Sequence, residues 1–586
     1  MAQSSSSKRP RRQAAVDTQQ LLKWLEEEED EQELGDLDES DEGEVDVLTT
    51  SDHETDTEQE MDEEDEDQTA TNARYYIGKD GFTKWNKQPP PKRVRTRSQN
   101  IITHLPGPKN EARNCTTEID IFNLFFSINI LNAIVKYTNI YISKVRNLYV
   151  RDRDARDTNS TEIKAFVGLL YLIGTIRSST KNAHKMWDNS KGNGLESCYL
   201  SMSEKRFRFL LRCIRFDDIT DREERRKIDK LAPIREIHEM FLTNFQKYFT
   251  PSEYLTVDEQ LLAFRGKCSF RQYIPSKPAK YGIKMFALCD VKTAYTVSLE
   301  PYLGKQPDGP YCFSTNAQDV VERLVTPVQG TNRNITGDNW FTSVSLVKAL
   351  KAKKLTYVGT IRKNRREVPA EFLYMRNRAL HSSIFGFESN CTMVSYCPKK
   401  NKAVLLISSM HFDDKIDEST GQAQKPEIIT FYNMTKTGVD VVDQLCERNN
   451  VARITRRWPM VMFFNLLNIA AINTFVIYKY HKFATNETCT RYDFLEMLSW
   501  ELIKTQIEHR SNIASLPKDL RNRASKLLKK NTNVQMAPQS PPSTSQGRCY
   551  ICPRSSDKKS KRWCKTCKKW ICSQHQFVVC QSCYDK

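Results

Sequence analysis

The last 39 residues carry the pattern that most restricts how this chain can fold. Seven of its 17 cysteines and one histidine occur there as four pairs, each enclosing two residues: Cys549 and Cys552, Cys564 and Cys567, Cys572 and His575, Cys580 and Cys583. Eight soft ligands with this spacing indicate two tetrahedral Zn²⁺ sites. So short a segment buries too little apolar surface to fold alone, and metal binding would supply much of its folding free energy.

The spacing leaves the pairing of these ligands open. We favour an interleaved cross-brace, because only four residues separate each of the last pairs: Cys549, Cys552, Cys572 and His575 on one zinc, and Cys564, Cys567, Cys580 and Cys583 on the other. Consecutive pairing is the alternative. The tail also has ten Lys or Arg against two Asp, with Lys568 and Lys569 beside Trp570. This composition favours DNA contact over recruitment of a ubiquitin-conjugating enzyme or reading of a histone peptide.

Charge is unevenly distributed along the chain. Residues 26–67 hold 25 of the 73 acidic residues and no Lys or Arg, so the remainder has 89 basic against 48 acidic residues, a net charge of +41. This excess predicts a polyanionic partner, with nucleic acid the first candidate. The acidic composition predicts a disordered N-terminal region over residues 1–110. Basic runs at residues 8–12 and 92–97 are candidate nuclear import signals, so we expect nuclear localisation.

Two further features indicate an intracellular protein. The N-terminus lacks the apolar segment of a signal peptide, and the ten cysteines outside the tail are scattered singly, as expected in a reducing compartment. The longest apolar run, residues 460–480, is interrupted by Asn465, Asn468 and Asn473. It therefore predicts a buried core helix, and we expect no membrane association.

Hydrophobic periodicity divides the middle of the chain. Residues 118–248 have the 3.6-residue period of helices, including a basic helix over residues 203–213. From residue 254, short β-rich segments alternate with helical ones at residues 317–324 and 344–350, which predicts an α/β domain with a mixed sheet. Residues 404–407 and 428–431 are predicted as further strands. Helices resume near Val439 and continue to about residue 530.

Several aspartates stand where metal chemistry would need them. Asp258 ends a predicted strand, Asp338 follows another, and Asp440 begins a helix with Asp443 one turn later on the same face. Clustered carboxylates repel one another unless cations neutralise them, so this group suggests two Mg²⁺ ions, with Mn²⁺ as an alternative. Aspartate is also a common turn and helix-cap residue, and the pattern alone leaves both interpretations open.

Longer motifs resemble the piggyBac family of DNA transposases. They are TVDEQLLAFRG at residues 256–266, IPSKPAKYGIK at 274–284, NITGDNWFTS at 334–343, GTIRKN at 359–364, TKTGVDVVDQL at 435–445 and RWPM at 457–460. The resemblance runs from about Tyr75 to Lys586 and includes the cysteine-rich tail. Carried over, the catalytic metal-binding aspartates are Asp258, Asp338 and Asp440, with Asp443 as an additional essential acid.

The resemblance also implies a domain organisation. An α/β RNase H-like catalytic domain would be interrupted by a β-rich insertion and embraced by a split all-α domain that dimerises and binds DNA, with a cross-brace zinc domain at the C-terminus. The implied boundaries are 111–252 and 450–530 for the helical domain, 253–364 and 428–449 for the catalytic domain, 365–427 for the insertion, 531–547 for a linker and 548–586 for the zinc domain.

The implied activity is cut-and-paste transposition by a homodimer on double-stranded DNA. Each transposon end, a terminal inverted repeat, would be nicked, and the freed 3′-hydroxyl would attack the opposite strand to leave a hairpin. The opened ends would join TTAA targets, which makes excision seamless. Arg362, Lys363, Arg365 and Arg366 follow the last core strand and are predicted along DNA phosphates. The alternative is a domesticated, non-catalytic DNA-binding or chromatin protein; the unsubstituted aspartates favour the enzyme.

Overall fold

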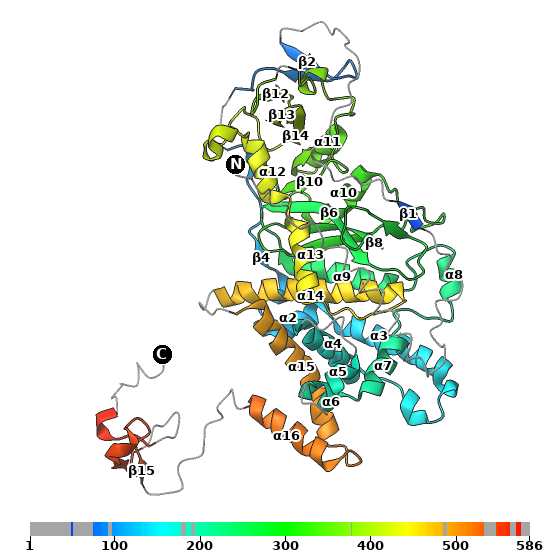
Figure 1. The fold of residues 1–586 in the computed structure, drawn as a ribbon, viewed down its shortest axis with the longest axis vertical. Coiled ribbons are helices and arrows are strands. Elements are labelled where there is room, and N and C mark those ends of the chain that lie inside the picture. The colour runs from blue at the N-terminus through cyan, green and yellow to red at the C-terminus, as the bar shows by residue number, and fades with distance from the viewer. Residues whose placement is uncertain are drawn as a thin grey trace, which may run out of the picture. The chain divides into compact units, whose positions relative to one another are not determined.

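The computed structural model describes residues 48–50, 74–91, 96–176, 183–188, 194–376, 378–483, 489–532, 546–562 and 570–575. The chain forms two compact units. The larger comprises residues 1–185 and 204–502, and the smaller comprises residues 186–203 and 503–586. A 12-stranded mixed sheet belongs to the larger unit (Figure 1).

Five strands at the centre of this sheet confirm the predicted α/β class. They are β6 (Tyr254–Ala263), β8 (Tyr281–Asp290), β9 (Thr296–Pro301), β10 (Asn334–Gly337) and β11 (Thr356–Thr360). Their order is β9-β8-β6-β10-β11, with β8 antiparallel to its neighbours and β10 and β11 parallel to β6. Helices α10 (Ala317–Leu324) and α11 (Val344–Ala352) precede β10 and β11. This mixed sheet with its helices fits an RNase H-like core.

Three strands between β11 and the following helix extend the same sheet. They are β12 (Ser383–Phe387), β13 (Thr392–Lys399) and β14 (Lys402–Ser408), and β14 pairs antiparallel with β11. Beyond β12 lie β3 (Lys84–Asn86) and β2 (Tyr75–Ile77), both from the region predicted to be disordered. The prediction of disorder is wrong for these residues. Trp85 is fully buried, and its Nε1 donates to the carbonyl oxygen of Glu367, which holds the hairpin against the segment that follows β11.

The sheet also receives a strand from the acidic stretch. β1 (Leu48–Thr50) pairs in parallel with β7 (Arg271–Tyr273), and β7 in turn pairs with β8. The ordered path through the sheet therefore begins at β1 and ends at β2.

Residues 428–431 form a helix and not the predicted strand. They belong to α12 (Glu427–Thr435), which is preceded by Pro426 and has an acidic residue in its first turn. Ile428, Ile429 and Tyr432 all lie on one side of this helix and pack against Val358 and Leu406 of the sheet. The β-branched residues favour a strand locally, but burial at helical spacing decides the outcome.

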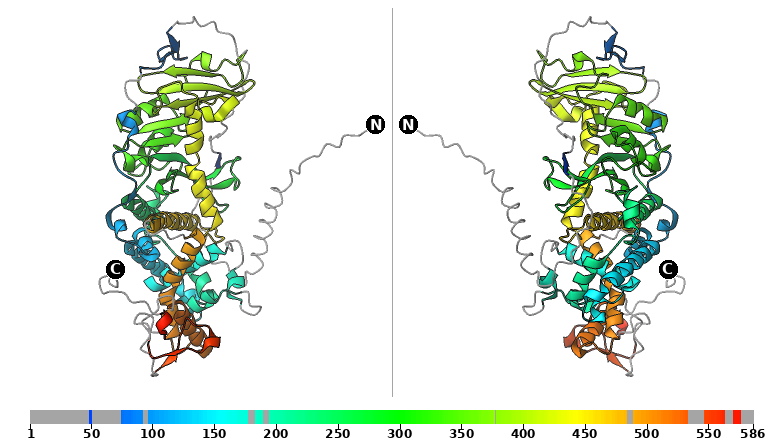
Figure 2. Two further views of the ribbon diagram at one scale, coloured as in Figure 1. Left: turned by 90° about the vertical axis from the view of Figure 1, so that its left-hand side faces the viewer. Right: turned by 90° about the vertical axis from the view of Figure 1, so that its right-hand side faces the viewer.

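Helices from both ends of the larger unit pack together below the sheet (Figures 1 and 2). They are α2 (Glu118–Phe125), α3 (Ile128–Val145), α4 (Ser160–Thr175), α7 (Glu204–Cys213), α9 (Arg235–Tyr248), α13 (Gly438–Arg448) and α14 (Trp458–Phe483). The short helix α8 (Arg222–Arg226) follows α7 in the chain. α14 is long and apolar enough to cross a membrane, yet 83% of its most apolar window is buried inside the protein. Asn473 at its centre exchanges two hydrogen bonds with the backbone of Thr296, which agrees with the predicted core helix.

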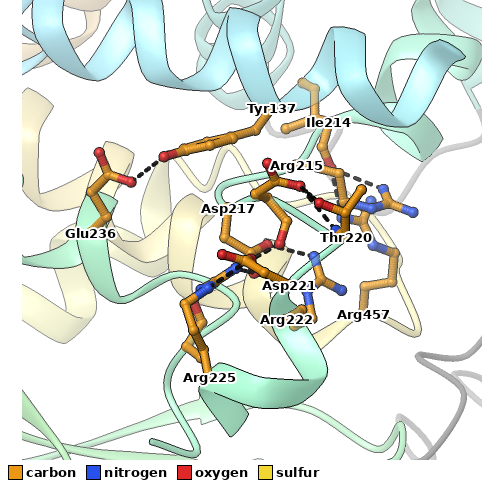
Figure 3. Close-up of polar contacts among 12 residues, drawn as sticks. Tyr137, Ile214, Arg215, Asp217, Thr220, Asp221, Arg222, Arg225, Glu236 and Arg457 are labelled. Atoms are coloured by element: carbon orange, nitrogen blue, oxygen red, sulfur yellow. Dashed lines mark hydrogen bonds and ion pairs between the residues drawn. The ribbon is translucent and has the colours of Figure 1, made fainter. Parts of the chain in front are cut away.

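Ion pairs and hydrogen bonds of arginine side chains stabilise the loop that follows α7 (Figure 3). Asp217 is buried and pairs with Arg222 at 2.5 Å and with Arg225 at 2.8 Å. Arg457 donates to the carbonyl oxygens of Arg212 and Ile214, which lie at the C-terminal end of α7. Arg457 thus ties the start of α14 to the end of a helix more than 240 residues earlier in the chain.

The basic helix α7 was predicted to expose its charged face, but Arg206 is buried. Its guanidinium donates to both oxygens of Glu162, at 2.9 and 2.6 Å, and Glu162 is itself 2% exposed. Burial favours the neutral acid, but the hydrogen bonds and charge of Arg206 outweigh it and lower the pKa of Glu162. The predicted basic surface of this helix therefore excludes Arg206.

We expect Arg206→Met to destabilise the larger unit by about 3–5 kcal/mol, because it leaves the Glu162 carboxylate buried without its main partner. The double variant with Glu162→Met should lose much less, since no charge remains buried. The check is the shift in the urea midpoint of the unfolding transition. Equal destabilisation of the single and double variants would contradict a role based on charge pairing.

The smaller unit holds α6 (Glu196–Ser201), α16 (Lys518–Thr532) and the end of α15 (Arg491–Ser511), while α5 (Ala183–Trp187) leads into it. Arg510 donates to the carbonyl oxygen of Leu200, and Arg523 donates to the hydroxyl of Tyr199. Its tail contains a short pair of strands, β15 (Gly547–Arg548) and β16 (Lys559–Ser560). In the larger unit β4 (Gly107–Pro108) pairs with β5 (Phe249–Thr250).

Candidate active site and zinc centre

Strand register brings Asp258 and Asp338 together. β6 and β10 are parallel neighbours, and Val257 pairs with Gly337, so the next residue of each strand is an aspartate. Asp258 lies within β6, not at its end as predicted, because β6 continues to Ala263 against β8. Backbone N–H groups of Trp340 and Phe341 donate to Oδ1 of Asp338 at 3.0 and 3.4 Å and hold its carboxylate in place.

Helix α13 adds Asp440 to this pair. The hydroxyl of Thr256 on β6 donates to the carbonyl oxygen of Thr435, and the hydroxyl of Thr336 on β10 donates to the hydroxyl of Thr435 at 2.8 Å. A Cβ atom at Gly438, the first residue of α13, would lie 2.7 Å from Oγ1 of Thr256. The glycine therefore permits the close approach of α13 to β6, and Asp440 stands in the first turn of that helix.

The three carboxylates line one cavity of about 290 Å³. Its other lining residues include Lys277 and Lys436 and the polar side chains of Ser276, Asn339, Thr360 and Tyr432. Burial raises the pKa of Asp258 well above its ordinary value, and the charges of Asp338 and Glu259 raise it further, against the opposing effect of Lys277. Oxygen ligands crowded in this way fit Mg²⁺, since a divalent cation would relieve their repulsion.

Asp443 lies apart from this group. It does not line the cavity, and its Oδ1 accepts a hydrogen bond from Nε2 of Gln260 at 2.6 Å. Burial raises the pKa of Asp443 to about 7, although Lys277 and the hydrogen bond from Gln260 lower it. Asp443 thus lies against Gln260, on the same face of β6 as Asp258, while Asp258, Asp338 and Asp440 line the cavity.

The raised pKa of Asp443 predicts a pH dependence of stability. A carboxyl group whose pKa is higher in the folded state stabilises the protein at acid pH, and this contribution is lost as pH rises through the folded value of about 7. We therefore expect Asp443→Asn to raise the melting temperature more at pH 8 than at pH 5. A shift that is equal at both pH values would contradict the assignment. The exposed Asp308→Asn serves as the matched control.

A buried ion pair supports the opposite face of β6. Lys284 and Glu259 are paired at 3.2 Å and are 3% and 0% exposed, so the ammonium of Lys284 is not available to DNA. The ammonium of Lys284 lies over the rings of Trp340 and Phe286, at 5.2 and 5.1 Å from their centroids. Trp340 also stacks on Phe286, so the loop that carries Asp338 is fixed by aromatic packing.

The predicted basic turn after β11 lines a second cavity, of about 600 Å³. Its lining residues are Asp80, Arg362, Asn364, Arg365, Arg366 and Glu367. Nη2 of Arg365 donates to the carbonyl oxygen of Thr342, and Lys363 is partly buried, with its pKa lowered by burial and by Lys402. The turn therefore presents three arginines at one cavity, together with Asp80, which the resemblance did not indicate.

The tail brings four predicted zinc ligands together. Ligand atoms of Cys549, Cys552, Cys572 and His575 all lie within 4.8 Å of one another. The contacts of Nδ1 of His575 with the three sulfurs measure 3.4 to 3.6 Å, and the sulfurs of Cys552 and Cys572 are 3.7 Å apart. A tetrahedral Zn–S site has edges of about 3.8 Å, so this geometry fits Zn²⁺.

This cluster is the first ligand set of the interleaved arrangement. The second set, Cys564, Cys567, Cys580 and Cys583, lies outside the described residues, as do Lys568 and Lys569.

Sequence reasoning found the aspartates and the first ligand set but missed the residues that hold them. Lys436 and Thr360 line the carboxylate cavity, and the threonines that join β6 and β10 to the end of α12, just before α13, were not singled out. A usable signal was present, because Thr256, Thr336 and Thr435 all fall inside the motifs that contain the aspartates.

The fold and these two sites define a transposase. The family model described as Transposase IS4 matches residues 117–475, more than half of the chain. The chain resembles the human PiggyBac transposable element-derived protein 3, at 23% identity over 65% of this chain and 67% of that protein. It also resembles the human PiggyBac transposable element-derived protein 5, at 21% identity over 68% and 77% of the two chains.

A solved structure carries the comparison further. It is a cryo-EM structure of a piggyBac transposase synaptic complex with hairpin DNA, with a TM-score of 0.68 and 38% identity over 82% of this chain and 100% of that one. This chain belongs to the piggyBac family of transposases.

Proposed function

We propose that this protein is a cut-and-paste DNA transposase that acts on terminal inverted repeats and TTAA targets as a homodimer in the nucleus. One observation carries the proposal: Asp258, Asp338 and Asp440 line a single cavity in a chain 38% identical to a transposase solved with hairpin DNA. Lys277 and Lys436 line the same cavity, and their positive charges suit the phosphates of a bound DNA strand.

The three aspartates would hold two Mg²⁺ ions, with Mn²⁺ as an alternative. When bound, the metals supply Lewis-acid activation of the attacking oxygen and stabilise the leaving oxygen of a phosphodiester. The chain's own contribution is positional, because strand register fixes Asp258 beside Asp338. Hydrogen bonds to Thr435 hold the end of α12, and Gly438 lets α13 begin close against Thr256. In the proposed reaction, water nicks each end, the freed 3′-hydroxyl attacks the opposite strand to form a hairpin, and the opened ends join the target.

The remaining assignments complete the proposal. Residues 253–364 and 428–449 form the catalytic domain, 365–427 the insertion, and 111–252 with 450–530 a split helical domain that dimerises and binds DNA. Residues 548–586 bind two structural Zn²⁺ ions after a linker at 531–547. The ligand cluster that includes Cys549 supports the assignment of the zinc domain. Strands β12 to β14 support the assignment of the insertion.

A donor-plasmid excision assay tests the proposal. Genomic sequence on either side of the gene supplies candidate inverted repeats, and a plasmid that carries them around a marker is the substrate. We expect the wild-type chain with Mg²⁺ to remove the marker and restore an intact TTAA. Binding of these repeats without excision by the wild type would instead support a domesticated DNA-binding protein, as the human relatives are named transposable element-derived proteins.

A further inference from the structure

An aromatic side chain stands exposed at the tip of the β2–β3 hairpin. Phe82 is 86% exposed, although the turn around it is tightly bonded. Oδ1 of Asp80 accepts hydrogen bonds from the backbone N–H groups of Phe82 and Thr83, both at 2.9 Å, and Oδ2 accepts from the hydroxyl of Thr83. Gly81 has a φ of +75° that this turn requires. The exposure of Phe82 therefore does not result from fraying of the hairpin.

The hairpin is also fixed to the basic turn after β11. The backbone N–H of Asp80 donates to the carbonyl oxygen of Arg366 at 2.9 Å, and Nε1 of Trp85 donates to that of Glu367 at 2.9 Å. Nζ of Lys79 donates to the carbonyl oxygen of Lys363. These hydrogen bonds hold the tip that carries Phe82 beside the turn that carries the arginines.

Positive charge surrounds this aromatic residue. The hairpin contributes Lys79 and Lys84, and the adjoining cavity of about 600 Å³ contributes Arg362, Arg365 and Arg366. Two acidic residues, Asp80 and Glu367, also line this cavity. The carboxylate of Asp80 accepts the hydrogen bonds of the hairpin turn, and these lower its pKa despite partial burial. Arg362 and Arg366 make no ion pair with any residue in the described part of the chain. An apolar protein partner would gain nothing from these cations, whereas a nucleic acid strand offers phosphates and base faces together.

The surface continues from the carboxylate site. Thr360, at the end of β11, lines the carboxylate cavity, and Arg362 two residues later lines the second cavity. Arg365 donates to Thr342, four residues after Asp338. A DNA strand whose phosphodiester lies at the aspartates would therefore pass next over the arginines and then reach Phe82.

We propose that the β2–β3 hairpin and the turn at residues 362–366 form a contact for unstacked DNA, in which the arginines bind phosphates and Phe82 stacks on an unpaired base. This inference rests on the proposed function, because it assumes that the carboxylate cavity receives DNA. It adds a surface of its own, built by the β2–β3 hairpin and by the turn that follows β11. Stacking on one exposed ring tolerates any base, so the contact recognises distortion of the strand and not its sequence.

The test compares two DNA probes that bind the full-length protein. One is a duplex with a candidate terminal repeat, and the other is the same duplex with four unpaired nucleotides at its end, the innermost replaced by 2-aminopurine. Phe82→Ala should weaken binding to the unpaired probe about tenfold and binding to the paired duplex less than about twofold. Phe82→Trp should retain both affinities and the quenching of 2-aminopurine. Phe313→Ala, at another exposed phenylalanine, is the control and should change neither.

Arg366→Ala separates the phosphate contact from the stacking contact. It should weaken binding to both probes and reduce the slope of log affinity against log salt by about one. Equal affinity of Phe82→Ala and wild type for the unpaired probe would overturn the inference. So would a change in oligomeric mass on Phe82→Ala without a change in DNA binding, since the ring would then contact a second copy. Failure of the wild type to bind either probe would count against the proposed function itself.

Discussion

Asp258→Asn, Asp338→Asn and Asp440→Asn should each reduce excision by on the order of a thousandfold or more, because each removes a negative oxygen ligand from a site whose chemistry depends on bound metal. All three face the same cavity, so none can substitute for another. DNA binding in the absence of Mg²⁺ should stay within about twofold of wild type, since the basic residues that contact phosphates are unchanged. The measurement is recovery of plasmids that have lost the element.

Asp443→Asn is the informative comparison. Asp443 does not line the cavity and contacts Gln260 instead, so its substitution should reduce excision less than the other three. Excision retained near the wild-type level in any one of the three cavity variants would remove that aspartate from the active site. A loss in Asp443→Asn as complete as in Asp258→Asn would show that the position beside Gln260 is as critical as direct metal binding.

Cys572→Ser should unfold the tail without affecting the rest of the protein. Cys572 contacts both Cys552 and His575, and its loss removes one of four ligands from a segment that has little apolar core. Structural zinc contributes about 10–16 kcal/mol to the folding of comparable segments, so no other interaction in the tail compensates. We expect bound zinc to fall from two ions per chain, and limited proteolysis to remove the tail rapidly, with the melting transition of the larger unit unchanged.

The exposed Cys312→Ser is the matched control and should keep both zinc ions. A chain that binds one zinc after Cys572→Ser and keeps a protease-resistant tail would indicate two independent sites, as in consecutive pairing. Wild-type protein that contains no zinc would exclude the metal centre altogether. Loss of repeat binding together with the tail would assign DNA contact to it, whereas unchanged binding would favour a protein partner.

The sequence predicted the chemistry of the sites better than the architecture that supports them. The paired spacing of the cysteines and His575 identifies them as metal ligands directly, although it leaves open which pairs share a metal, and the cluster of Cys549, Cys552, Cys572 and His575 matches the favoured pairing. The aspartates were recognisable because they stand in motifs shared with the piggyBac family. Neither signal contains tertiary contacts, which is why neither indicates that Arg206 and Lys284 are each buried beside a glutamate.

Local composition misled where a distant part of the chain completes an element. Residues 428–431 are rich in β-branched side chains, yet they form a helix because the sheet offers an apolar face to one side of α12. The β2 and β3 segments look like polar linker, and only the buried Trp85 with its bond to Glu367, 282 residues away, makes them strands. Strands of three residues are too short to have a recognisable hydrophobic period, so the sequence does not reveal strands that depend on distant parts of the chain.

The N-terminal region supplies both outermost strands of the central sheet, β1 on one side and β2 on the other. An outermost strand has a row of unpaired backbone groups, which invites pairing with other chains and aggregation. Here the acidic and polar N-terminal region covers two such rows, because β1 pairs with β7 and the β2–β3 hairpin pairs with β12. Truncation at residue 110 would expose β7 and β12 together, whereas removal of residues 1–47 leaves both covered. We therefore expect a protein shortened to begin after residue 110 to aggregate, and one that begins at residue 48 to stay monodisperse.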